Sequence, residues 1–184
     1  MLAPRKKLWS TPDTAINMAG EMVSLSSKDL VYDVGCGDGR VLINLAATTE
    51  CRNFVGIEIN PDRVEEAKTN IEMAKGSGEI PSDTQFDIRC MNALNVEDYH
   101  KASVIFLYLV PRGLRIMKPL LKEAASSMRR NGKQTTVCNH TKIESCLYVV
   151  TYMAGFEDEA PIDQRTCEVQ HQKGSAWPIY LYRF

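Results

Sequence analysis

Long hydrophobic runs are missing from this 184-residue sequence. No apolar stretch approaches the roughly 18 residues that a membrane-spanning helix needs. Residues 1–30 also lack the apolar segment of a secretory signal peptide. We therefore expect a soluble protein without a membrane anchor, located in the cytoplasm, with the nucleus as the alternative compartment.

Metal-ligand patterns and strong net charge are absent too. The six cysteines form no CxxC pair, and no set of four cysteines and histidines has the spacing of a structural zinc site. The sequence therefore predicts no metal site, and we expect free, mostly buried thiols in a reducing compartment. A formal net charge of -1 gives no overall attraction to a polyanion, and the one basic cluster, residues 5–7, is interpreted as a solvated arm. We do not expect nucleic acid as a partner.

What the sequence does contain is an apolar strand that runs into a glycine-rich turn. The strand carries Asp33, and Gly35, Gly37 and Gly39 then let the backbone turn sharply and approach a ligand without a Cβ atom in the way. Asp33 and Asp38 would repel the phosphates of a dinucleotide. A ligand with an amino group and a sulfonium centre gains from them instead. We therefore expect S-adenosylmethionine as the cofactor and S-adenosylhomocysteine as its product.

A second carboxylate indicates a nucleoside site. Residues 54–57 form another apolar run that ends in Glu58, where an acid can accept hydrogen bonds from both hydroxyls of a ribose. Dinucleotide-binding folds share this acid, so Glu58 indicates adenosine without identifying the cofactor, whereas the GxGxG spacing differs from their GxGxxG form. Strand, glycine turn, helix, strand and acid together favour a cofactor site over a glycine-rich turn that binds nothing.

Apolar periodicity predicts alternating helices and strands. Helices are expected from a start at Thr11-Pro12-Asp13 with a capping hydroxyl, over residues 40–48, from Pro61 onward, and over 114–128 with a kink or restart at Pro119. Strands are expected at 30–34, 54–58, 85–89, 104–110 and 134–139, and a carboxy-terminal hairpin at 164–170 and 179–184. This order predicts a doubly wound, Rossmann-like α/β sandwich whose sheet is mostly parallel with an antiparallel hairpin at its edge. We expect one domain over residues 1–184, with residues 1–28 contributing an arm and a helix to the cofactor site.

Several motifs resemble those of a known family. They are Trp9-Ser10-Thr11-Pro12, the turn 33–40, Gly56-Ile57-Glu58-Ile59-Asn60-Pro61, Leu107-Tyr108-Leu109-Val110-Pro111, Lys118-Pro119 and Ile179-Tyr180-Leu181-Tyr182. Over nearly its whole length the chain resembles a class I, seven-strand S-adenosylmethionine-dependent methyltransferase. More narrowly, it is similar to a group of protein lysine methyltransferases. That group includes archaeal enzymes of broad specificity and the mitochondrial methyltransferases of the ATP synthase c subunit and the adenine nucleotide translocase.

The resemblance implies roles for individual residues. It places Thr11 over the cofactor, Asp33 near the cofactor's amino acid end, Glu58 on the ribose and Asn92 beside the adenine. The other cofactor contacts it implies are Gly35, Cys36, Gly37, Gly39, Ile59, Asn60 and Ala93. Unlike the mitochondrial members, this sequence has no membrane helix ahead of Trp9, so we do not expect it to act at a mitochondrial membrane.

A lysine acceptor sets a chemical requirement. Its amine has an unperturbed pKa near 10.4, so presenting it uncharged at pH 7 costs about 4 to 5 kcal/mol unless the site lowers that pKa. An apolar channel lowers it by desolvation. We expect Trp9, Leu109 and Pro111 to line this channel together with Tyr108, the candidate catalytic residue, for which core packing of the ring is the equal alternative.

The sequence therefore predicts a methyltransferase whose partner is a protein substrate that carries the acceptor lysine. Two alternatives remain open. One is a methyltransferase that acts on a small metabolite or on nucleic acid, and the other is a non-catalytic S-adenosylmethionine-binding module that regulates a partner. His140, after the fifth expected strand, is a second candidate base, although a loop histidine is more often a hydrogen-bonded surface residue.

Overall fold

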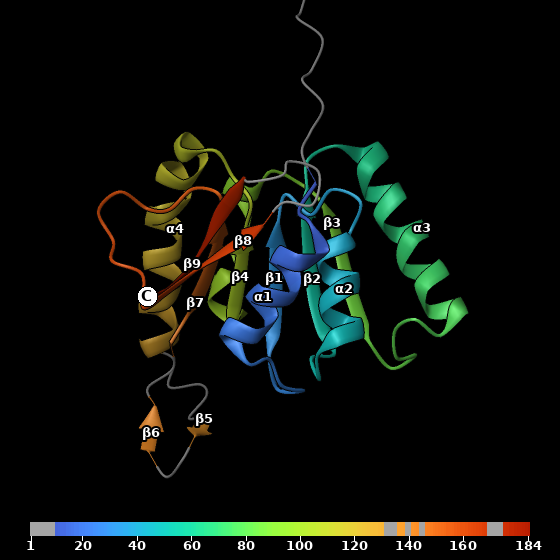
Figure 1. The fold of residues 1–184 in the computed structure, drawn as a ribbon, viewed down its shortest axis with the longest axis horizontal. Helices are drawn as coiled ribbons and strands as arrows, with labels where there is room; N and C mark the ends of the chain where they lie inside the picture. Colours follow the sequence, from blue (N-terminus) through green and yellow to red (C-terminus); the bar gives the residue numbers. More distant parts are fainter. Residues whose placement is uncertain (1–9, 131–135, 139–140, 144–145, 169–174) are drawn as a thin grey trace, which may run out of the picture.

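The centre of the molecule is a seven-stranded sheet with helices on both faces (Figure 1). The computed structural model describes residues 10–130, 136–138, 141–143, 146–168 and 175–184. The strand order is β3-β2-β1-β4-β7-β9-β8, and the first five strands in this order are parallel neighbours. β9 runs antiparallel to both β7 and β8. This arrangement confirms the predicted doubly wound sandwich with an antiparallel carboxy-terminal hairpin.

Most element bounds agree with the periodicity of the sequence. The strands of the sheet are β1 Leu30–Val34, β2 Asn53–Glu58, β3 Gln85–Cys90, β4 Val104–Leu107, β7 Tyr148–Tyr152, β8 Asp163–Glu168 and β9 Ala176–Arg183. The helices are α1 Asp13–Val23, α2 Arg40–Thr48, α3 Pro61–Ser77 and α4 Pro111–Arg130, with two short 3-10 turns, η1 Ala93–Asn95 and η2 Tyr99–Lys101.

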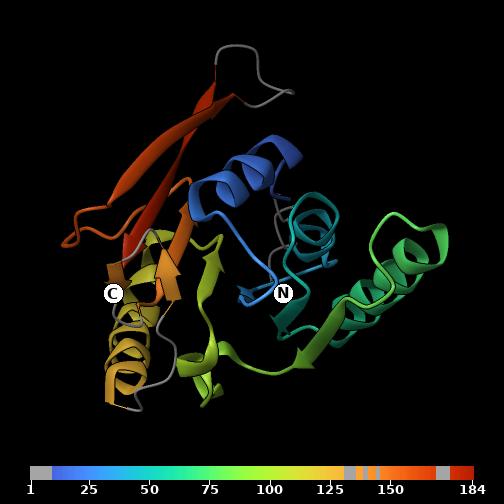
Figure 2. The same ribbon diagram turned by 90° about the horizontal axis from the view of Figure 1, so that it is seen from below.

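Helices cover the two faces of the sheet unequally. Figure 2 shows α1 and α2 on one face and α4 on the other. β1 and β4 are buried on both faces, because apolar side chains alternate between the two core clusters: Val31 and Val104 pack with α1 and α2, whereas Tyr32 and Ile105 pack with α4. The sheet is thereby held rigidly enough to fix the loops at its carboxyl edge.

The helix α4 keeps its predicted apolar spacing. Its buried side chains are Leu114, Met117, Leu121, Ala124, Ala125 and Met128. The helix continues through Pro119 without restarting, and Pro119 itself is exposed, so the predicted restart is wrong. A proline removes one backbone donor, and an exposed helix face tolerates this loss better than a buried one. Within the part of the chain that the structure describes, no helix is both long and apolar enough to cross a membrane.

The expected fifth strand at 134–139 does contain a strand, but its expected place in the main sheet is wrong. Its described part, β5 Thr136–Cys138, pairs with β6 Thr141–Ile143 in a separate two-stranded antiparallel sheet, seen at the bottom of Figure 1. The place beside β4 belongs to β7, with Ile105 opposite Val149. β7 is buried at four of its five positions and rich in β-branched and aromatic residues, which suits a central parallel strand.

The end of β4 and the start of α1 also differ from the expectation. β4 ends at Leu107 instead of residue 110, because Pro111 begins α4, a position that suits the fixed φ of proline. Residues 108–110 therefore connect β4 to α4.

Thr11 does not cap α1. The N-cap is Pro12, which makes no side-chain capping bond, and Thr11 is buried instead.

Candidate functional site

The expected site residues gather where parallel strands end, at the upper edge of the sheet in Figure 1. The glycine turn follows β1, Glu58 ends β2, Asn92 follows β3 and Tyr108 follows β4. Carboxyl ends of neighbouring parallel strands lie side by side, so these four segments meet at one edge. Met153, which the sequence does not single out, follows β7 at the same edge.

The glycine turn is fixed by backbone hydrogen bonds. Gly35 and Cys36 donate their N–H groups to the Ile57 carbonyl at 2.7 and 3.0 Å. Gly39 has φ +81°, and a Cβ atom there would lie 3.3 Å from the Ala67 Cβ, so this glycine lets the turn pack against α3. Gly35 has φ +87°, and a Cβ atom there would meet only a Leu109 methyl, at 4.0 Å, so the turn leaves room for a ligand beside Gly35.

The Glu58 carboxylate ties the first turn to the second. Its Oε2 accepts a hydrogen bond from Gly37 N at 3.1 Å, and its Oε1 accepts from Ile59 N at 2.8 Å and Asn60 N at 2.9 Å. Asn60 in turn caps α3 by accepting from Asp62 N at 3.0 Å. A carboxylate offers about four lone pairs, so Glu58 still has capacity for a ligand hydroxyl.

Asp33 is the most unusual group of the site. It is 3% exposed, and its Oδ2 has no hydrogen-bond partner in the part of the chain that the structure describes. Burial raises the pKa of Asp33 to about 8, and the negative charges of Asp38 and Glu58 add to the shift. A buried carboxyl without a partner is costly in free energy. A cationic ligand group at this point would remove that cost.

Two arginines surround the turn, and neither was singled out from the sequence. Arg40 holds Asp38 in an ion pair, with Nη2 at 2.6 Å and Nε at 3.1 Å from the carboxylate. Burial opposes ionisation of Asp38, but the hydrogen bonds from Arg40 outweigh it, and its pKa lies below the usual value. Arg63 covers Gly37: its Nη2 lies 2.9 Å from the point where a Cβ of Gly37 would be. Asp33 and Glu58 are therefore the carboxylates that remain for a ligand.

The third turn presents polar and apolar groups. Asn92 is exposed, and its Oδ1 accepts from Leu94 N at 3.0 Å, which caps η1. The Ala93 carbonyl accepts the Tyr99 hydroxyl at 2.9 Å. Ile59 and Leu94, at the ends of the adjacent strands β2 and β3, are 66% and 45% exposed. Exposed apolar side chains beside a polar amide suit a planar nucleobase.

Three of the residues expected to line an acceptor channel, Tyr108, Leu109 and Pro111, follow β4. The Tyr108 hydroxyl donates to the Met153 sulfur at 2.8 Å, and its ring meets Tyr152 edge-on at 5.1 Å between centroids. Leu109 lies against Gly35, and Pro111 is exposed at the start of α4. Trp9 and His140 lie outside the described residues.

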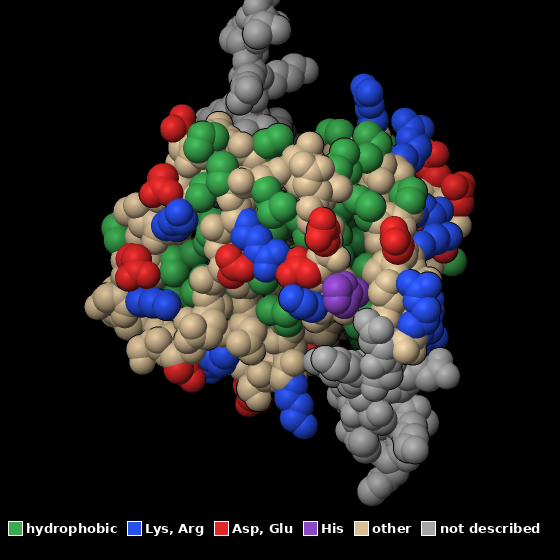
Figure 3. All heavy atoms as spheres, turned by 180° about the vertical axis from the view of Figure 1, so that it is seen from behind, with side chains coloured by type: hydrophobic (Ala, Val, Ile, Leu, Met, Phe, Trp, Pro, Cys, Tyr) green, Lys and Arg blue, Asp and Glu red, His purple; other side chains and the backbone are tan. Residues whose placement is uncertain are grey.

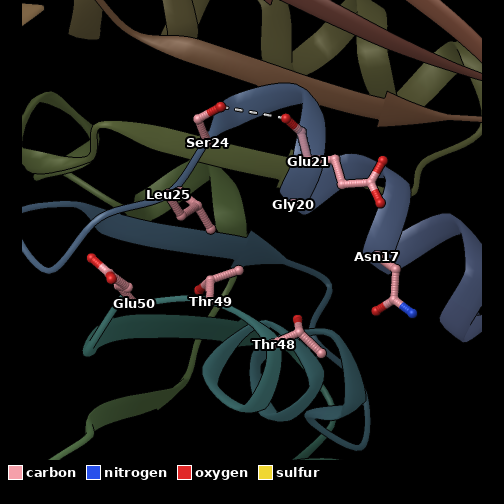
Figure 4. A pocket seen from close by; sticks show the side chains of 8 residues that line it. All are labelled: Asn17, Gly20, Glu21, Ser24, Leu25, Thr48, Thr49 and Glu50. Atoms are coloured by element: carbon pink, nitrogen blue, oxygen red, sulfur yellow. Dashed lines mark hydrogen bonds between the residues drawn. The ribbon is translucent and has the colours of Figure 1, made fainter.

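A separate cavity of about 510 Å³ lies away from this edge (Figure 4). It is lined by Asn17, Gly20, Glu21, Ser24, Leu25, Thr48, Thr49 and Glu50, from the carboxyl ends of α1 and α2 and the segments that follow them. α2 begins at the glycine turn and has 9 residues, a length of about 13 Å at 1.5 Å per residue. None of the expected site residues lines this cavity.

The strand order, the glycine turn and the acid that ends β2 together define a class I methyltransferase. The sequence profile of the ANTKMT methyltransferase domain matches residues 33–140, more than half of the chain. The chain therefore belongs to this family, which confirms the resemblance seen in its motifs.

Individual relatives agree with this assignment. A protein-lysine N-methyltransferase of Saccharolobus islandicus is 32% identical over 115 residues, 61% of this chain and 66% of the relative. An uncharacterized methyltransferase of Schizosaccharomyces pombe is 29% identical over 154 residues, 77% of this chain and 53% of the relative. The matches thus span about half to two thirds of these relatives' own lengths.

Solved structures share the fold. An RNA methyltransferase from Salinibacter ruber in complex with S-adenosyl-L-homocysteine has a TM-score of 0.69 and 27% identity, and the match covers 95% of this chain and 93% of that one. A putative tRNA (m1A22) methyltransferase of Streptococcus pneumoniae has a TM-score of 0.61 at 16% identity over 90% of this chain and 70% of that one, a likeness of fold alone.

Proposed function

We propose that this protein transfers methyl groups from S-adenosylmethionine to lysine amines of a protein substrate. The buried Asp33 carboxyl beside the glycine turn carries the cofactor assignment. Its Oδ2 has no hydrogen-bond partner among the described residues, so it offers a cationic ligand an ion pair in a desolvated place. The lysine assignment is supported by the similarity to the Saccharolobus protein-lysine N-methyltransferase.

The residues present at the carboxyl edge fit the cofactor. Asp33 would hold its ammonium group, Glu58 its ribose hydroxyls, and Asn92 with Ile59 its adenine. Gly35 leaves space for it against the backbone. Bound S-adenosylmethionine supplies an electrophilic methyl group on a sulfonium sulfur. The protein then has to hold an uncharged acceptor amine in line with that methyl group.

The acceptor side lowers the amine's pKa by desolvation. Leu109 and Pro111 are apolar, and the Tyr108 ring is half-buried. Burial also raises the pKa of the Tyr108 hydroxyl, so this group stays a neutral phenol around pH 7 and does not serve as the proton acceptor. The amine's proton therefore leaves to solvent before transfer, helped by the positive sulfonium nearby.

A pH-rate profile tests whether the amine loses its proton before the methyl transfer. Turnover at saturating cofactor is expected to rise about tenfold per pH unit above neutrality until the lowered pKa of the bound amine is passed. Initial rates of methyl-lysine formation between pH 6 and pH 9, on a protein acceptor identified by labelling, measure it. A flat profile over this range would contradict a lysine that must first lose its proton.

The RNA methyltransferase likeness makes RNA the second candidate acceptor. Incubation of the protein with methyl-labelled S-adenosylmethionine and a dialysed cell lysate separates the two. We expect label that is removed by protease and resists ribonuclease. Label that ribonuclease removes would assign RNA, label in the small-molecule fraction would assign a metabolite, and cofactor binding without any transfer would assign a regulatory module.

A further inference from the structure

Met153 has a strained backbone at the edge of the site. It has φ +66°, a left-handed backbone conformation that residues other than glycine rarely adopt. Its N–H donates to the Pro178 carbonyl of β9 at 2.9 Å, which holds the strained turn in place. Strained residues of this kind persist when the surrounding structure over-determines them, and they are frequent at functional sites.

The segment after Met153 has no room to relax. A Cβ atom on Gly155 would lie 2.5 Å from the Tyr182 hydroxyl oxygen. The same hydroxyl accepts a hydrogen bond from Phe156 N at 3.0 Å, and the rings of Phe156 and Tyr182 meet edge-on at 4.9 Å between centroids. The turn after β7 is therefore fixed against β9, and with it the direction of the Met153 side chain.

The hydrogen bond between Tyr108 and Met153 can form in only one sense, with Tyr108 as the donor. A thioether sulfur has no proton, so the Tyr108 hydroxyl must donate and the Met153 sulfur must accept, at 2.8 Å. The phenol has one proton and two lone pairs. With the proton committed to sulfur, the oxygen is left to accept a hydrogen bond from another group. The edge-on contact with Tyr152 fixes the ring in this orientation.

We propose that Met153 is a positioning residue that makes the Tyr108 hydroxyl a hydrogen-bond acceptor for the N–H of the incoming amine. This inference rests on the proposed lysine methylation and assigns the polarity of its acceptor site. The Tyr108 oxygen accepts an N–H of the amine, and the nitrogen lone pair is thereby directed at the methyl group. Without the sulfur, the phenol O–H can instead donate to the amine's lone pair, the pair that must attack.

A double-mutant cycle tests the proposal. Met153→Leu keeps the volume of the side chain and removes the sulfur. We expect it to lower kcat about tenfold at unchanged affinity for S-adenosylhomocysteine, and Tyr108→Phe to do the same. Because Met153 acts through the hydroxyl, the double variant should be no slower than Tyr108→Phe alone. Multiplying effects would overturn the proposal and assign Met153 to packing.

The matched control is Met22→Leu, a partly buried methionine of α1 in the same apolar cluster. It should leave kcat unchanged. An ultraviolet resonance Raman difference spectrum between each protein and its Tyr108→Phe counterpart reports the hydroxyl's hydrogen bond without any turnover. A changed Tyr108 signal in Met153→Leu supports the proposal and an unchanged one overturns it. Absence of methyl-lysine with a changed Tyr108 signal would instead refute the proposed function and, with it, the role of the contact in amine binding.

Discussion

Replacing Glu58 by alanine is expected to weaken S-adenosylmethionine binding by about 2 to 4 kcal/mol. The variant would lose the proposed hydrogen bonds to the ribose. It also loses the three backbone hydrogen bonds to Gly37, Ile59 and Asn60 that order both turns before the ligand arrives. The effect therefore combines lost contacts with lost preorganisation. Calorimetric titration with S-adenosylmethionine and S-adenosylhomocysteine measures it.

Two variants control this experiment. Glu72→Ala removes an exposed carboxylate from α3 and should leave the affinity unchanged. Glu58→Gln keeps the side chain's shape and should weaken binding less than Glu58→Ala. Circular dichroism checks that each variant is folded. A folded Glu58→Ala protein with wild-type affinity would mean that Glu58 does not bind the cofactor.

Replacing Asp33 by asparagine is expected to stabilise the free protein while weakening cofactor binding. The amide needs no ionisation in the buried site that Asp33 occupies without a partner for its Oδ2. We expect a gain of about 1 to 3 kcal/mol in the free energy of unfolding at pH 8, which corresponds to roughly 2–4 °C in Tm per kcal/mol. Cofactor affinity should fall about tenfold to a hundredfold, since the proposed ion pair with the ammonium group would be lost.

The direction in which folding stability changes with pH distinguishes Asp33 from Asp38 and Asp98. Its folded-state pKa of about 8 lies above the ordinary pKa of 3.8 for a free aspartate side chain, so the folded protein keeps a proton that the unfolded chain releases. The free wild-type protein therefore loses stability from this group as pH rises from about 4 to about 8. Asp38 and Asp98 have lowered pKa values and act in the opposite direction. The difference in Tm between Asp33→Asn and wild type isolates Asp33.

That difference in Tm should widen across this pH range and then level off. Differential scanning calorimetry at pH 5, 6.5 and 8 measures it. Binding should also release a proton in the wild type below pH 8 and release fewer in Asp33→Asn, which titrations in two buffers of different ionisation enthalpy detect. A constant Tm difference at all three pH values would show that Asp33 is already ionised in the free protein.

The place of the glycine turn and of Glu58 in the fold could be predicted because it depends on local geometry. A turn with three glycines after an apolar strand requires little tertiary information, and the acid at the end of β2 follows from the position of that strand. The same holds for the amphipathic spacing of α4. The partners of each carboxylate were not predictable. Arg40 forms an ion pair with Asp38, whereas Asp33 Oδ2 has no hydrogen-bond partner among the described residues. This difference depends on distances that only the folded chain defines.

The strand beside β4 was predicted wrongly because its identity depends on strand order. The sequence predicts residues 134–139, which follow α4 directly, as that strand, whereas β7 lies there. Because the neighbouring strand was predicted wrongly, the contact between Met153 and Tyr108 was not predicted. Met153 contacts Tyr108 only because β7 pairs with β4. No sequence signal marks a methionine with positive φ, although Gly155 two positions later indicates a tight passage.

The face of the molecule that carries α4 is mixed in charge. Figure 3 shows basic and acidic side chains interspersed over the face that carries α4, with hydrophobic side chains between them. Lys118 and Lys122 of α4 pair with Glu159, and Arg89 pairs with Asp98. Paired cations offer little to the phosphates of an RNA chain. This distribution agrees better with a protein acceptor.

The most direct measurement of the central claim identifies the residue that receives the methyl group. The protein is incubated with methyl-labelled S-adenosylmethionine and the protein fraction of a lysate, in parallel with Glu58→Ala. The products are hydrolysed to amino acids and separated. We predict label in N-methylated lysine with the wild type and a strong reduction with the variant. Label confined to other amino acids, or no label in protein at all, would contradict the proposed lysine methyltransferase.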